Sequence, residues 1–153
     1  MKALIAYFSW SNNTKNLVEE LNTNFNFDVV RIDRKEPYSR DYDTCAYVEA
    51  KKEVEMRIHP EIKKLKVDFN SYDKILLFFP IWWYTFPMPI ATFIKSLKGY
   101  KGEIIVFANS YTNDPQYMEN SMKDLHAIDK NLKFREGLFN QNVNKHIEFI
   151  KRI

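Results

Sequence analysis

The sequence is poor in the residues that build cross-links and metal centres. Its 153 residues include one cysteine, Cys45, and three histidines, His59, His126 and His146. A single thiol excludes an internal disulfide and a thiolate cluster for zinc or iron–sulfur. The histidines are far apart, with no acid or thiol at metal-ligand spacing beside them, so we expect them on the surface or on helices and expect no metal site.

Glycine and net charge are also scarce. There are three glycines, and no G-x-x-x-x-G-K-[ST] loop is present, which disfavours ATP or GTP as the ligand. The net charge is +3, with scattered basic residues and no basic stripe with interleaved aromatics, so we expect no nucleic-acid partner. No signal-peptide pattern precedes the first apolar run, and we expect a cytoplasmic protein.

A long uncharged run is present between Lys74 and Lys95. Its twenty residues, ILLFFPIWWYTFPMPIATFI, are long enough to span a membrane. However, Pro80, Pro87 and Pro89 each remove a backbone donor and would break a continuous helix. We therefore predict a buried strand at Ile75–Phe79, an aromatic loop, and a helix that starts at Pro89, with no membrane association.

Other apolar segments alternate between strand and helix character. We predict four further strands, at Ala3–Phe8, Phe27–Asp33, Glu103–Ala108 and Leu132–Phe134. Apolar residues at helical spacing predict one helix that begins near Thr14 and a second helix that Asp43 or Thr44 can cap. The same spacing predicts two further helices, over Met118–Leu125 and Val143–Ile153. For the second helix, the expected buried face is Tyr47, Ala50, Val54 and Ile58. The alternation predicts one α/β domain over residues 1–153, a three-layer doubly wound parallel sheet in the order 2-1-3-4-5.

Two unusual loops follow the first and third predicted strands, which flank the switch point of such a sheet. The first contains Ser9, Ser11 and Thr14 just before a helix, where hydroxyls and free backbone N–H groups favour a phosphate monoester. These residues are equally able to act only as helix caps.

The second loop holds Trp82, Trp83 and Tyr84, which are suited to stacking on a flat heterocycle, while the peptides of residues 81–85 bond its polar edge. Core filling or a homodimer contact is the other interpretation. Together the two loops predict a mononucleotide with a planar ring, and flavin mononucleotide (FMN) is the usual one in this sheet order.

The sequence resembles short bacterial flavodoxin-like proteins, whose loops read F-S-x-[ST]-G-N-T and P-I-W-W-G-T-x-P-x-P. Here Phe8–Thr14 reads FSWSNNT and Pro80–Pro89 reads PIWWYTFPMP. The resemblance implies electron transfer or reduction by bound FMN. The cofactor-binding residues that it implies are Ser9, Trp10, Ser11, Asn12, Asn13, Thr14, Pro80, Ile81, Trp82, Trp83, Tyr84 and Thr85, with Asn109, Ser110 and Tyr111 in the loop after the fourth strand.

One position departs from the resemblance in a way that predicts local structure. Tyr84 stands where the relatives have glycine, and we expect its Cβ to disfavour a positive φ. No residue set suggests acid–base or nucleophilic catalysis, so any activity belongs to the cofactor.

Alternatives remain at this stage. A phosphorelay receiver needs acids where Ser9 and Pro80 stand, and a low-molecular-weight phosphatase needs a cysteine in the first loop. A flavin-free binding module that uses the aromatic loop stays open. Purely electron-carrying flavodoxins are typically acidic, so a charge of +3 favours an FMN-dependent oxidoreductase acting on a small quinone-like acceptor.

Overall fold

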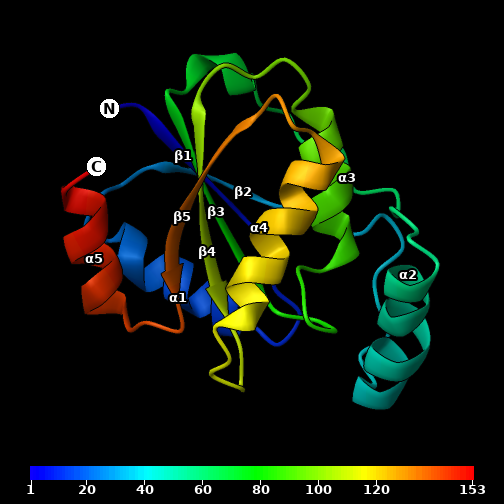
Figure 1. The fold of residues 1–153 in the computed structure, drawn as a ribbon. Helices are drawn as coiled ribbons and strands as arrows, with labels where there is room; N and C mark the ends of the chain where they lie inside the picture. The colour runs from blue at the N-terminus through cyan, green and yellow to red at the C-terminus, as the bar shows by residue number, and fades with distance from the viewer.

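The computed structural model describes residues 1–153 and contains one five-stranded parallel sheet (Figure 1). Its order is β2-β1-β3-β4-β5, as predicted. The strands are β1 (Ala3–Tyr7), β2 (Asp28–Arg31), β3 (Lys74–Pro80), β4 (Glu103–Asn109) and β5 (Lys133–Phe139). The central strands β1 and β3 are buried at nearly every position, which explains their unbroken apolar sequences.

Helices cover both faces of the sheet (Figure 1). Helices α1 (Asn13–Asn22) and α5 (Val143–Lys151) pack on one face, and α3 (Met88–Ser96) and α4 (Gln116–Ile128) pack on the other. A π-helix, η1 (Thr44–Ala50), continues as α2 (Lys51–Glu55), and a 3₁₀ turn, η2 (Phe69–Ser71), precedes β3. No helix is both long and apolar enough to cross a membrane.

Alternate residues of the strands belong to two separate hydrophobic cores, one on each face of the sheet. Leu77 and Phe79 of β3 belong to the larger core beneath α3 and α4, whereas Leu76 and Phe78 belong to the smaller core beneath α1 and α5. The period of two along a strand produces this division. Both faces are therefore fixed by packing, and the carboxyl ends of β1, β3 and β4 are held at one edge of the molecule.

The predicted fifth strand is too short. β5 runs from Lys133 to Phe139, and several of its side chains are exposed because it lies at the sheet edge. Its pairing with β4 shifts register between Val106 and Ala108, and a Cβ on Gly137 would lie 2.7 Å from the Val106 carbonyl oxygen. Because β5 contains polar residues and shifts register against β4, it lacks the unbroken apolar run that identified the other strands.

The predicted buried face of the second helix is correct only in part, because Ala50 is buried and Val54 packs against the larger core but the other two positions are exposed. Tyr47 is 56% exposed and Ile58 lies beyond the helix at 36% exposure. Ala50 is buried, and so is Cys45, which the helical pattern did not select. In Figure 1 the η1–α2 segment lies beside the sheet rather than across a face, so its residues meet solvent and the carboxyl-end loops.

Candidate functional site

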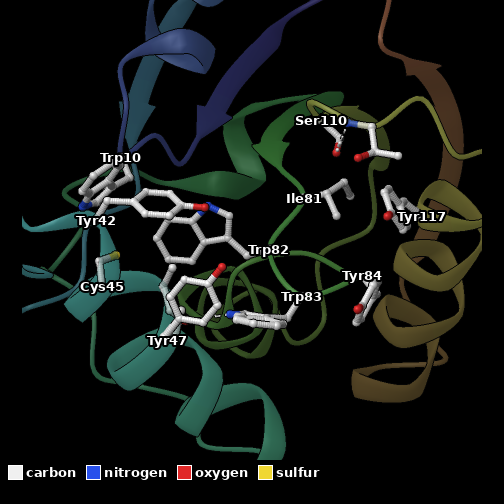
Figure 2. Close-up of a pocket in the computed structure, with 13 residues that line it drawn as sticks. Trp10, Tyr42, Cys45, Tyr47, Ile81, Trp82, Trp83, Tyr84, Ser110 and Tyr117 are labelled. Atoms are coloured by element: carbon white, nitrogen blue, oxygen red, sulfur yellow. Dashed lines mark hydrogen bonds between the residues drawn. The ribbon is translucent and has the colours of Figure 1, made fainter.

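A cavity lies beside the loops at the carboxyl ends of β1, β3 and β4. It has two parts of about 370 Å³ each, which share the residues Trp10, Tyr42, Ile81, Trp82, Ser110 and Thr112. We call the part beside Ser11 and Asn13 the turn chamber; Pro80, Asn109 and Tyr111 complete its lining. The other part, the aromatic chamber, extends to η1 and to Tyr117 of α4 (Figure 2).

The first loop presents a row of unused backbone donors. None of the N–H groups of residues 9–14 donates to a protein acceptor; the first bonded ones are Lys15 N, to Ser9 Oγ, and Asn16 N, to Asn12 O. Asn12 has a left-handed backbone with φ 72°, and its side chain makes no cap bond. The row stands at the amino end of α1, where the helix dipole is positive. The loop therefore has the unpaired donors and the dipole that favour an anion.

The loop's side chains have different surroundings. Ser9 and Thr14 are buried, and Thr14 Oγ1 donates to Asn109 Oδ1 at 2.9 Å. Ser11 and Asn13 are exposed and face the turn chamber. Thr14 is thus a first-turn hydroxyl that ties α1 to the end of β4, while the exposed side chains and the backbone remain free for a ligand.

The second loop makes a tight turn of two left-handed residues. Trp82 N donates to Thr85 O at 2.8 Å, and the two residues between them, Trp83 and Tyr84, have φ 52° and 73°. This is the pattern of a type I′ turn, which normally selects asparagine and glycine. Tyr84 therefore adopts the positive φ that its Cβ was expected to disfavour.

Contacts from two helices hold that turn. Trp83 Nε1 donates to Ala46 O of η1 at 2.8 Å, and Asn120 Nδ2 of α4 donates to Tyr84 O at 3.0 Å. Each left-handed residue with a Cβ costs roughly 1–2 kcal/mol. The turn is a strained element that the surrounding structure stabilises, a feature found at binding sites.

The aromatic residues of the turn occupy separate positions (Figure 2). Trp82 makes edge contacts with Phe8 and Tyr38, with ring centroids 5.1 and 5.2 Å apart. Trp83 meets Tyr47 edge-on, and Tyr84, which is 61% exposed, lies beside Tyr117. Trp82 therefore forms a fixed wall of both chambers, whereas Tyr84 stands at the rim.

The helix η1 supplies a wall that the sequence analysis missed. Tyr42, just before it, and four of its residues line the aromatic chamber, namely Cys45, Ala46, Tyr47 and Ala50. Asp41, rather than the predicted Asp43 or Thr44, caps it by accepting bonds from Thr44 N and Thr44 Oγ1. A π-helix inside a helical segment often marks a functional site. The sequence contains no separate signal for this wall, because Tyr47 occupies a position that its helical spacing assigns to the core.

The loop after β4 closes the cavity. Ser110 N donates to Asn140 Oδ1 at 2.6 Å, and Asn140, which was not predicted, has φ 53°. Tyr111 is 96% exposed. Thr85 lines neither chamber, and its hydroxyl donates to Asp124 Oδ2 of α4 at 2.7 Å. Of the predicted residues, all but Ser9, Asn12, Thr14 and Thr85 line one or both chambers.

The cavity has no set of groups for acid–base chemistry. Its lining contains no acid, histidine, lysine or arginine. Burial raises the pKa of the Cys45 thiol to about 11, so this thiol is neutral at physiological pH. The site can hold an anionic group at one end and a flat aromatic group at the other, but chemistry there needs a bound cofactor.

Comparisons with known proteins agree with this geometry. The family model of flavodoxins matches residues 2–151. A Lactobacillus acidophilus flavoprotein solved in complex with FMN is 23% identical, with 97% of this chain and 98% of that chain covered and a TM-score of 0.81. The apo-form of a flavoprotein from the same organism is 28% identical over 92% of both chains, with a TM-score of 0.71. A Bacteroides eggerthii protein, provisionally described as a flavoprotein, is 28% identical, with coverage of 99% and 97% and a TM-score of 0.79. No curated protein matches the sequence.

Proposed function

The chain belongs to the flavodoxin family, and on that premise we propose that it binds FMN and delivers electrons to a small, flat, quinone-like acceptor. The observation that carries the proposal is the row of unpaired N–H groups at residues 9–14 beside an aromatic cavity. FMN has one phosphate and one planar ring, and this site offers one recognition element for each.

The phosphate fits the first loop. Six consecutive donors, with the Ser11 and Asn13 side chains beside them, neutralise and orient an anion without a metal or a lysine. Asn12 has the left-handed backbone that occurs in turns whose successive N–H groups bind anions. In this proposal Ser9 and Thr14 do not contact the phosphate but support the loop. The buried Ser9 hydroxyl accepts from Lys15 N, and the buried Thr14 hydroxyl donates to Asn109.

The flavin ring fits the space that Ile81, Trp82, Trp10 and Tyr42 line in both chambers. The N–H groups of Trp83, Tyr84 and Tyr111 have no protein acceptor and are available to the polar edge of the ring. Bound FMN supplies the redox chemistry, by taking up and releasing electrons. The protein's part is to hold the ring, exclude water on the Trp82 side and leave one edge open.

The edge of the flavin ring that the protein leaves open favours a small electron acceptor. The aromatic chamber continues past Trp82 to Tyr84 and Tyr117, where an exposed ring and a half-buried ring offer a stacking surface. The net charge of +3 is unlike the acidic surface that complements basic redox proteins. Both features favour a small aromatic acceptor over a protein acceptor.

Two measurements test the proposal. First, flavin-free protein titrated with FMN should quench flavin fluorescence with a dissociation constant in the micromolar range or below. An unchanged signal would leave the flavin-free binding module as the better account.

Second, anaerobically photoreduced, FMN-loaded protein should be reoxidised by a benzoquinone faster than by an equal concentration of oxidised cytochrome c. The reverse order would reject the small acceptor while keeping FMN. The variant Tyr117→Ala, which enlarges the far end of the chamber, should slow the quinone reaction more than the cytochrome reaction.

A further inference from the structure

A second cavity adjoins the FMN site on the other side of Trp10. It measures about 250 Å³ and lies between the first loop, the end of β2 and residues 34–40. Trp10 is the only residue that it shares with the turn and aromatic chambers. We call it the basic pocket, because four of its ten lining residues are cations: Arg31, Arg34, Arg40 and Lys63.

Only some of this charge is neutralised by the protein. Arg34 is fully engaged, with Nη2 2.8 Å from Glu49 Oε2 and Nη1 3.1 Å from Glu53 Oε2. Arg31 Nε pairs with Asp33 Oδ1 at 3.1 Å, and Asp33 is the one carboxylate in the lining. Arg40 and Lys63 form no ion pair. The pocket therefore keeps two uncompensated cations.

The Arg40 side chain is held in place by neighbouring groups, whereas Lys63 is fixed only through its backbone. The Arg40 guanidinium stacks 4.7 Å from the Trp10 ring centroid, and its Nη2 donates to Trp10 O at 3.1 Å, so Nε and Nη1 stay free. Lys63 N donates to Asp33 O at 2.8 Å, which fixes the backbone of Lys63 beside the pocket. Arg31 adds a free Nη1, because its Nη2 donates to Ser9 O at 2.9 Å. Free donors thus come from three separate segments of the chain.

We propose that the basic pocket binds a second phosphate, the phosphate monoester of a reduced, phosphorylated nicotinamide dinucleotide that gives a hydride (two electrons and one proton) to the flavin and leaves as the oxidised dinucleotide. A hollow of this size admits one phosphate group, and the free N–H groups of Arg31 and Arg40, with the Lys63 ammonium, can donate to its oxygens. The assignment to an electron donor rests on the proposed flavin function, because Trp10 separates the pocket from the FMN site. The phosphate site itself does not rest on that function.

The test compares neighbouring charge reversals. Lys63→Glu places a carboxylate at the pocket, whereas Lys64→Glu makes the same change in net charge at an exposed residue outside its lining. Binding of oxidised dinucleotides, NADP⁺ and NAD⁺, is measured by calorimetry on FMN-loaded and flavin-free protein at low salt. Inorganic phosphate and ribose 5-phosphate serve as probes for a free or small phosphorylated ligand.

NADP⁺ should bind at least about tenfold more tightly than NAD⁺, which lacks the extra phosphate. Lys63→Glu should abolish that preference, and Lys64→Glu should preserve it. If ribose 5-phosphate or inorganic phosphate binds as tightly as NADP⁺ with the same sensitivity to Lys63→Glu, the phosphate site stands and belongs to a smaller ligand.

The proposal would be overturned if the two charge reversals had equal effects on the binding of every phosphate probe. It would also be overturned if the unmodified protein bound NADP⁺ and NAD⁺ equally and did not bind the other probes. Phosphate binding that persists in a chain unable to bind FMN would support the pocket and reject the flavin function. The two proposals therefore fail independently.

Discussion

Thr14 and Asn109, 95 positions apart in the sequence, are joined by a 2.9 Å hydrogen bond from Thr14 Oγ1 to Asn109 Oδ1. Asn109 also accepts Ile81 N at 2.9 Å through its carbonyl oxygen. One asparagine thus connects the three loops that form the cavity. Since those loops come from distant parts of the chain, the geometry of the site depends on this junction.

Removing the Thr14 hydroxyl should weaken both the fold and the FMN site. Thr14→Ala leaves Asn109 without its buried donor and should lower the free energy of unfolding by about 1–2 kcal/mol. Thr14→Ser keeps the hydroxyl and should recover most of the bond. Urea unfolding and FMN titration of both variants measure the two effects. Loss of stability in Thr14→Ala with unchanged FMN affinity would show that the bond only supports the helix.

Relieving the left-handed backbone at Tyr84 should stabilise the protein. Tyr84→Gly removes the Cβ at φ 73° and should raise the free energy of unfolding by about 1 kcal/mol relative to Tyr84→Ala, which keeps the Cβ but equally lacks the ring. Comparing these two variants cancels the lost contact with Tyr117. Thermal unfolding decides the point, and equal midpoints for the two variants would show that the turn carries no strain.

Stability should fall in mild acid because of His146. Burial against Phe78 and Phe107 lowers the pKa of this histidine, so it is neutral in the fold. A depressed pKa means that the unfolded chain takes up the proton first, and stability is lost as the pH falls below about 6.5. The loss should approach about 1.4 kcal/mol per pH unit at its steepest.

The corresponding variant is His146→Gln, which cannot titrate. It should be less stable at pH 7.5 but should show a smaller further loss between pH 7 and 5. His126→Gln, at an exposed position of α4, is the matched control. If the difference between His146→Gln and the unmodified protein stays constant across this pH range, the buried imidazole does not set the acid sensitivity.

Cys45 should react slowly with alkylating reagents. Burial raises its thiol pKa to about 11, and the side chain is 3% exposed on the wall of the aromatic chamber. At pH 8 its thiolate fraction alone predicts alkylation by iodoacetamide about a hundredfold slower than in the urea-unfolded chain. Bound FMN should slow it further. Equal rates in folded and unfolded protein would contradict the structure of this wall.

The sheet could be predicted because strands buried on both faces, such as Ile75–Phe79, leave an unbroken apolar run. The positions of the two main loops followed from the order of those strands. The wall formed by η1 could not be predicted, because Tyr47 at helical spacing looks like a core residue whether it faces a sheet or a ligand cavity. The turn at Trp83–Tyr84 was equally hidden, since its left-handed backbone depends on hydrogen bonds from η1 and α4, which are distant in sequence. Asn140 joined the site through the same kind of long-range contact.

The central claim is that residues 9–14 receive the phosphate of FMN. Backbone N–H groups are not removed by side-chain substitution, so the most direct test changes the ligand. FMN and riboflavin share the same ring and differ in the phosphate, and both can be titrated into flavin-free protein by fluorescence quenching. The account predicts that FMN binds at least about a hundredfold more tightly, the equivalent of ~2.7 kcal/mol. Equal affinities for FMN and riboflavin would contradict it.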